Sequence, residues 1–143
     1  PLKPLAELRS VQKDESARAL ASAIEAHSLA EALLARAREA LDAYRDESSR
    51  VERLATSALE VGDLRASDLV SWTGLRVRRG ETEAGLEEDV AIKSARARDA
   101  KAKVDQAREN VGAAGVAAKI LSRDESRWLA ARAREHESRE EDD

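Results

Sequence analysis

Residues 34–58 read LARAREALDAYRDESSRVERLATSA, and this stretch decides the fold. Its apolar and small residues recur in alternating steps of three and four, which places them on one stripe of a helix. This first stripe consists of Leu34, Ala37, Leu41, Tyr44, Ser48, Val51, Ala55 and Ala58. Only Ser48 is polar. A heptad pattern of this kind predicts a helix that packs along its length against another helix.

The first stripe continues toward the N-terminus. In the same frame it passes through Leu20, Ala23, His27 and Ala30. Nearer the start of the chain, Leu5, Leu8 and Val11 indicate a shifted register. No Pro or Gly interrupts the chain from Leu5 to about Glu60, which predicts a helix roughly 84 Å long at about 1.5 Å per residue.

A second stripe has the same alternation. It runs through Leu86, Val90, Lys93, Ala97, Ala100, Val104, Ala107, Val111, Ala114, Ala118, Leu121, Glu125 and Trp128. Extended backward, the stripe meets Arg79, Arg76 and Trp72. Residues 76–85 therefore bring no large apolar side chain to the stripe, and glycines stand at 74, 80 and 85. The low helix propensity of glycine leaves a kink or fraying open there.

The two stripes are separated by one short break. Gly62 predicts a left-handed helix cap, and Ser67 predicts the N-cap of the next helix. So short a connection makes the two helices antiparallel neighbours. The predicted fold is all-α. A single helical hairpin, forming an antiparallel two-stranded coiled coil, occupies residues 1–143, with helices at about 4–60 and 68–138, a turn at 61–67 and a charged tail to 143.

The composition supports this prediction and excludes several classes of function. Charged residues make up 38% and aromatic residues 2%, which suits long helices better than a thick core. The net charge is only −4, which argues against disorder and against nucleic acid as the main partner. There is no Cys for a disulfide or a thiolate metal site. No apolar run approaches the roughly 20 residues that span a bilayer, so no integral membrane segment is expected.

The sequence contains no pattern that predicts catalysis. His27 and His136 stand alone, so neither predicts a metal site. The glycines of residues 112–115 lie inside a helical pattern rather than between a strand and a helix, which does not favour a phosphate loop. Carboxylates are abundant, but tuning them for acid–base work requires burial. We therefore expect no enzyme, no cofactor and no metal.

Two tryptophans mark candidate binding surfaces. Trp72 follows the turn and precedes Arg76 and Arg79, and this combination of residue types is frequent at binding hot spots. Trp72 also fits a second interpretation, as a cap on the end of the coiled coil, and one aromatic side chain can do both. Trp128 lies in frame with the second stripe, which favours packing near the N-terminal residues over a partner contact.

Four segments together resemble a known family. They are LKPLAELR at residues 2–9, LDAYR at 41–45, GDLRASDL at 62–69 leading to Trp72, and the Arg-, Glu- and Asp-rich residues 135–143. In order and spacing they resemble the FliJ/YscO family, the coiled-coil stalk proteins of flagellar and virulence type III secretion. The resemblance implies a fold similar to the central shaft of rotary ATPases.

The resemblance also implies partners and sites. The end that carries both termini would enter the hexameric export ATPase through Leu5, Leu8, Arg9, Leu121, Trp128 and Arg132. The turn end would contact the cytoplasmic part of the export gate through Leu69, Trp72, Leu75, Arg76 and Arg79. Family members also handle empty export chaperones and work in the cytoplasm, at the base of a membrane-bound export apparatus. The alternative is a generic coiled-coil adaptor or a chaperone-like clamp with unrelated protein partners.

Overall fold

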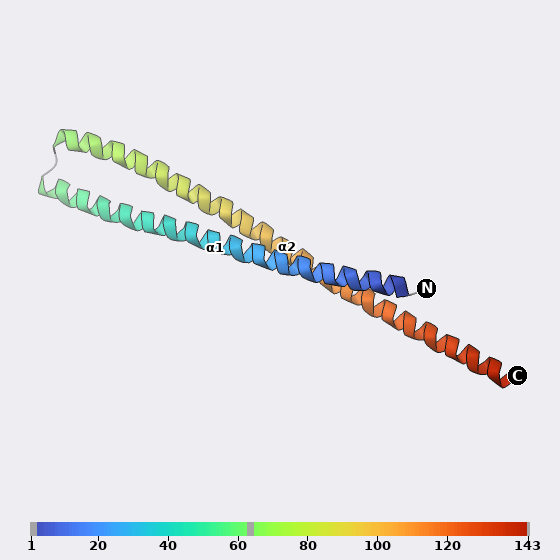
Figure 1. Ribbon diagram of the computed structural model, residues 1–143. Coiled ribbons are helices and arrows are strands. Elements are labelled where there is room, and N and C mark those ends of the chain that lie inside the picture. Colours follow the sequence, from blue (N-terminus) through green and yellow to red (C-terminus); the bar gives the residue numbers. More distant parts are fainter. Residues whose placement is uncertain (1–2, 63–64, 143) are drawn as a thin grey trace. The chain divides into compact units, whose positions relative to one another are not determined.

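The chain folds into two long helices. The computed structural model describes residues 3–62 and 65–142. Helix α1 (Lys3–Val61) and helix α2 (Ala66–Asp142) are joined by a short connection, and no strand occurs in the described ranges (Figure 1). The predicted all-α helical hairpin is confirmed. Asp63 and Leu64, which belong to the predicted turn, lie outside the described residues.

Helix α1 ends at Gly62 in the manner that the sequence predicts. Gly62 has a φ of 80°, in the left-handed region, and its N–H donates to the Leu59 carbonyl oxygen at 3.1 Å. A side chain is strained in this conformation, and glycine avoids that strain because it has no Cβ. The glycine therefore stops the helix and turns the chain toward α2.

The prediction that Ser67 is the N-cap of the second helix is wrong. Helix α2 begins at Ala66, two residues before the start at residue 68 that this cap implies. The Arg65 carbonyl oxygen accepts the first helical hydrogen bond, from Leu69 N at 3.1 Å, and the Arg65 N–H donates to Asp68 Oδ2 at 3.0 Å. This carboxylate satisfies a free N–H and faces the positive end of the helix dipole. It fixes the start of α2 without a hydroxyl cap.

Replacing Gly62 by Ala is expected to destabilise the hairpin by about 1 kcal/mol, because alanine is strained at a positive φ. Gly85→Ala is the matched control, since Gly85 is helical and a Cβ there meets nothing within 4 Å. That variant is expected to gain up to about 1 kcal/mol from helix propensity. Urea denaturation followed by circular dichroism measures both changes. Equal effects of the same sign would contradict this account of the connection.

The chain forms two compact units, and each contains part of both helices. We call His27–Ala100 the turn unit, and Pro1–Ala26 with Lys101–Asp143 the terminal unit. In the turn unit the buried side chains are Leu34, Ala37, Leu41 and Ala97. In the terminal unit they are Val104 and Ala107. The cores of both units thus consist of small and medium apolar side chains.

Burial in the turn unit follows the first stripe. Every stripe residue from 34 to 58 is buried or half-buried, while the residues between them are exposed. In the terminal unit the same frame continues through Ala6, Arg9 and Ser16, which are half-buried. Leu5, Leu8 and Val11 are exposed, so the predicted shift of register is wrong. A shift would require α1 to change its winding locally, and the helix instead keeps one frame.

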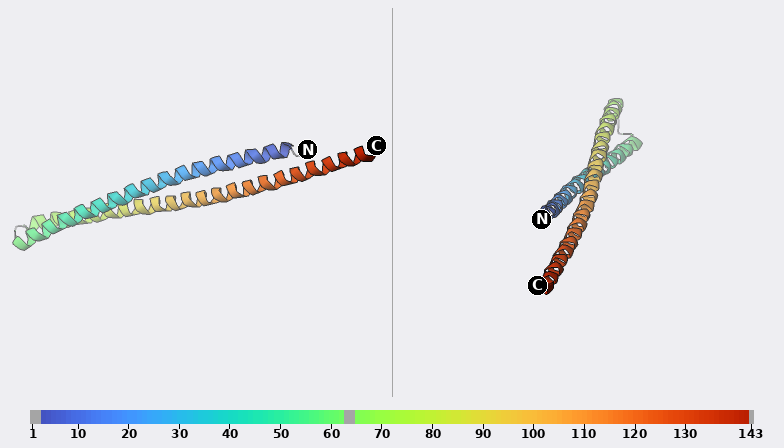
Figure 2. Two further views of the ribbon diagram at one scale, coloured as in Figure 1. Left: turned by 90° about the horizontal axis from the view of Figure 1, so that it is seen from below. Right: turned by 90° about the vertical axis from the view of Figure 1, so that its right-hand side faces the viewer.

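Helix α2 runs without interruption through the glycines at 74, 80 and 85 (Figures 1 and 2). Three glycines in a helix cost about 3 kcal/mol relative to alanine. Hydrogen bonds and ion pairs to α1, described below, hold this stretch in place. The tail is also helical, since α2 ends at Asp142 rather than near residue 138. From residue 126 to 142 every described residue is exposed, and within the terminal unit this part of α2 continues past the start of α1 (Figure 2).

Candidate protein-binding sites

Arg45 links the two helices of the turn unit. Its Nε donates to Glu83 Oε1 at 2.9 Å, and its Nη2 donates to Glu87 Oε1 at 2.7 Å. These hydrogen bonds, first that to Glu83 and then that to Glu87, raise the pKa of the Arg45 guanidinium above its ordinary value. Because the three side chains are partly exposed, the pairs contribute more to register than to stability.

Two further contacts tie the glycine-containing part of α2 to α1. Arg76 Nη2 lies 3.1 Å from Glu52 Oε1, and the Tyr44 hydroxyl donates to the Arg79 carbonyl oxygen at 3.3 Å. The hydroxyl therefore binds the backbone of α2 and not the Arg79 side chain. Together with Arg45, these contacts fix which residues of the two helices face each other.

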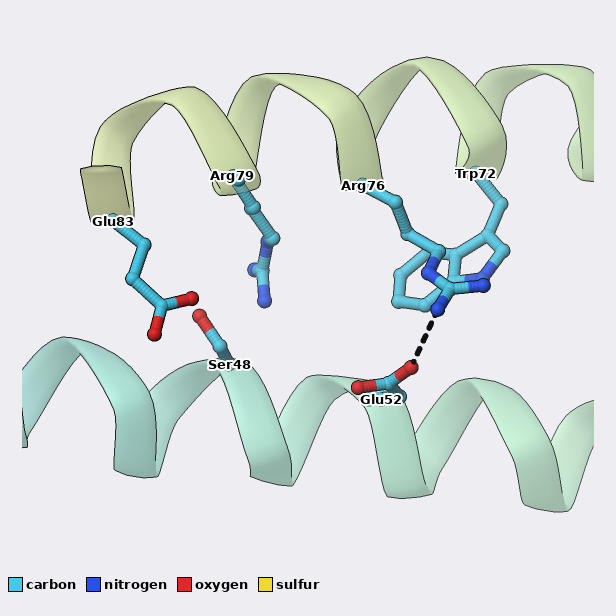
Figure 3. Close-up of a pocket in the computed structure, with 7 residues that line it drawn as sticks. Ser48, Glu52, Trp72, Arg76, Arg79 and Glu83 are labelled. Carbon is cyan, nitrogen blue, oxygen red and sulfur yellow. Dashed lines mark ion pairs between the residues drawn. The ribbon is translucent and has the colours of Figure 1, made fainter. Parts of the chain in front are cut away.

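A pocket of about 150 Å³ opens between the helices of the turn unit. Its lining residues are Ser48, Glu52, Trp72, Arg76, Arg79, Gly80 and Glu83. Figure 3 shows the Arg79 side chain reaching from α2 toward α1, between Ser48 on one side and the Arg76–Glu52 ion pair on the other. We call this the turn-end pocket. It contains three of the five residues that the resemblance assigns to the gate, namely Trp72, Arg76 and Arg79.

The remaining predicted turn-end residues lie close by in α2. Leu75 is half-buried, and it lines a second pocket of about 300 Å³ together with Ala55, Asp68, Ser71 and Trp72. Leu69 is exposed. The backward extension of the second stripe placed Arg76 at the helix interface, but Arg76 is exposed and Leu75 takes the inner position. Trp72 belongs to both pockets and is half-buried.

The predicted ATPase-end residues fall into three groups within the terminal unit. Arg9 and Leu121 are brought together, since both line a groove of about 190 Å³ between α1 and α2. Leu5 and Leu8 are exposed large apolar side chains outside that groove. Trp128 is 38% exposed, and the Arg132 guanidinium lies 5.1 Å from the centre of its ring. This cation–π contact holds the tryptophan and arginine together on one face of the helix.

The six buried side chains among the described residues are all apolar. Within residues 3–62 and 65–142 no group of three acidic or histidine side chains could hold a metal ion. Across the same ranges, neither helix contains a stretch apolar enough to cross a lipid bilayer.

Sequence reasoning did not assign Ser48, Glu52, Gly80 and Glu83 to the turn-end site. Their place depends on which residue of α1 faces which residue of α2. A signal was available, because facing residues lie at equal distances from the connection, and Ser48 is the one polar member of the first stripe. Counting back from the end of α1 at Val61 and forward from the start of α2 at Ala66 brings Ser48 opposite Arg79.

Comparisons with protein-family models, with curated proteins and with solved structures find no match to this chain.

Proposed function

We propose that the chain is a non-enzymatic stalk of a type III protein export apparatus. In this proposal the end that carries both termini binds the hexameric export ATPase, and the turn end binds the cytoplasmic part of the export gate. The chain then works peripherally at the cytoplasmic base of the apparatus. Escort of empty export chaperones is a further activity of the same helical surfaces.

The observation that carries the proposal is a helical hairpin with two separate groups of binding-type side chains. At the turn end, a half-buried Trp72 lies beside Arg76 and Arg79 in an open pocket. Tryptophan and arginine are the residues most enriched at binding hot spots. This arrangement supports a protein contact there, and the resemblance identifies the partner as the export gate.

The terminal unit supports a second protein contact. Leu5 and Leu8 are 40% and 52% exposed, and Trp128 is exposed under Arg132. A pair of packed helices is roughly 20 Å across, which suits the central opening of a protein ring better than a flat surface. Apolar and aromatic side chains on the outside of such a pair are available to the inner wall of the ring.

The burial of the side chains supports a binding role in preference to a catalytic one. A catalytic acid or base needs a shielded environment to change its proton affinity. Among the described residues no polar or charged side chain is buried. Binding alone is the function that this arrangement supports best.

Affinity capture with the export ATPase and the gate domain from the same genome tests the proposal. The full chain, verified as helical by circular dichroism, is expected to retain both proteins. If the helical chain retains neither, the stalk function is wrong, and the alternative of an adaptor with unrelated partners takes its place.

A further inference from the structure

Charge pairing in the turn-end pocket leaves one arginine without a partner. Glu52 is engaged by Arg76 at 3.1 Å, and Glu83 is engaged by Arg45 at 2.9 Å. No ion pair to Arg79 occurs among the described residues. The two carboxylates in the pocket wall therefore already accept hydrogen bonds from other arginines, and Arg79 is the arginine of the pocket that forms no ion pair with them.

The hydrogen-bond donors of the pocket also indicate a missing acceptor. Arg79 Nη1 and Ser48 Oγ are buried atoms without a hydrogen-bond partner in the part of the chain that the structure describes. A buried donor without an acceptor destabilises the structure, and more so when it is charged. An acceptor that enters the pocket would remove this destabilisation at both residues. Figure 3 shows Ser48 and Arg79 pointing into the space between the helices.

We propose that the turn-end pocket binds a carboxylate side chain from an acidic, partly apolar peptide segment of a partner protein, with Arg79 as the principal donor. A carboxylate matches the planar fork of a guanidinium and accepts two hydrogen bonds from it. A phosphate group carries more negative charge. Glu52 and Glu83 in the same wall would repel that charge more strongly.

The apolar part of the segment is assigned to the second pocket. Trp72 lines both pockets, so a single segment can place a carboxylate beside Arg79 and an apolar side chain between Ala55 and Leu75. The Trp72 indole is the shared wall. A sequence that alternates acidic and apolar residues has this chemistry.

This inference rests on the proposed binding role of the turn end, but it does not depend on the partner being an export gate. It is tested by peptide titration of the full chain, followed by tryptophan fluorescence. The chain contains two Trp, so Trp128→Phe leaves Trp72 as the only reporter. The probe is a blocked pentapeptide that alternates leucine and glutamate, and its neutral counterpart has glutamine in place of glutamate.

The glutamate peptide is expected to give a saturable signal, with binding about tenfold tighter than the glutamine peptide. Arg79→Gln should weaken binding by about tenfold. Arg78→Gln is the matched control, because it removes the same charge from an exposed neighbour outside the pocket, and it should leave binding unchanged. Arg79→Lys keeps the positive charge but loses the planar guanidinium, so this variant should bind the glutamate peptide with intermediate affinity. It also tests the inference if Arg79→Gln does not fold.

Three results would overturn the inference. They are no saturable signal from a fully helical chain, equal weakening by the substitutions at 78 and 79, and binding of inorganic phosphate as tight as that of the glutamate peptide. The outcome is separable from the stalk proposal. Peptide binding by a chain that captures no export component would support the pocket alone. Gate binding that is unaffected by Arg79→Gln would support the stalk alone.

Discussion

Leu34→Ala is expected to lower the free energy of unfolding of the hairpin by about 2–4 kcal/mol, the largest stability effect of any substitution considered for this protein. Leu34 is 4% exposed. Truncation to alanine removes buried apolar surface and leaves a cavity that the surrounding side chains fill only in part. The described residues contain only six buried side chains, so few others remain to hold the helices together. Urea denaturation monitored at the helix signal measures the loss.

The matched control is Leu54→Ala. Leu54 lies in the same helix and the same unit, but it is 66% exposed. Its removal is expected to change stability by less than about 0.5 kcal/mol. If the two substitutions lower the free energy of unfolding equally, burial along the first stripe would not be the source of stability. The pairing of α1 with α2 would then need revision.

Trp72→Ala is expected to weaken binding of the export gate by about 30-fold or more, the loss typical of a hot-spot side chain. The indole forms a wall of both turn-end pockets, so its removal opens both at once. Helicity should stay constant, because alanine favours the helix more than tryptophan. Calorimetric titration of the gate domain with the wild-type and variant chains measures the affinities.

Val70→Ala is the control for that experiment, since Val70 is 75% exposed and lies two residues away in the same helix. It should leave gate affinity unchanged. The competing interpretation of Trp72 as a structural cap makes a different prediction. In that case Trp72→Ala would lower the unfolding midpoint as much as Leu34→Ala does, while gate binding stayed intact.

The pairing of the helices was predictable from sequence wherever apolar residues marked it. Leu34, Ala37 and Leu41 recur with the helical period, and they are the buried residues of α1. Near the N-terminus the same reasoning failed, because Leu5 and Leu8 are larger than Ala6 and suggested a different frame. In this part of α1 the helix stays regularly wound, and this keeps Ala6 in the inward-facing frame. The sizes of the side chains alone do not show that the winding is regular.

The turn-end site was only partly predictable for a related reason. Trp72, Arg76 and Arg79 were visible as a cluster of residue types within one helix. The ion-pair partners in this site were not visible from sequence, because each pair joins the two helices. Glu52 of α1 pairs with Arg76, and Glu83 of α2 pairs with Arg45. The glycine stretch was misleading, because a propensity scale contains no contribution from the contacts that Tyr44 and Arg45 make with α2.

Titration of the export ATPase and the gate domain against three forms of the chain tests most directly whether the two ends of this hairpin bind different proteins. The forms are the wild type, Trp72→Ala and Trp128→Ala. The account predicts that the wild type binds both partners, that Trp72→Ala loses affinity only for the gate, and that Trp128→Ala loses affinity only for the ATPase. A helical wild-type chain that binds neither partner, or two variants that lose both partners equally, would contradict it.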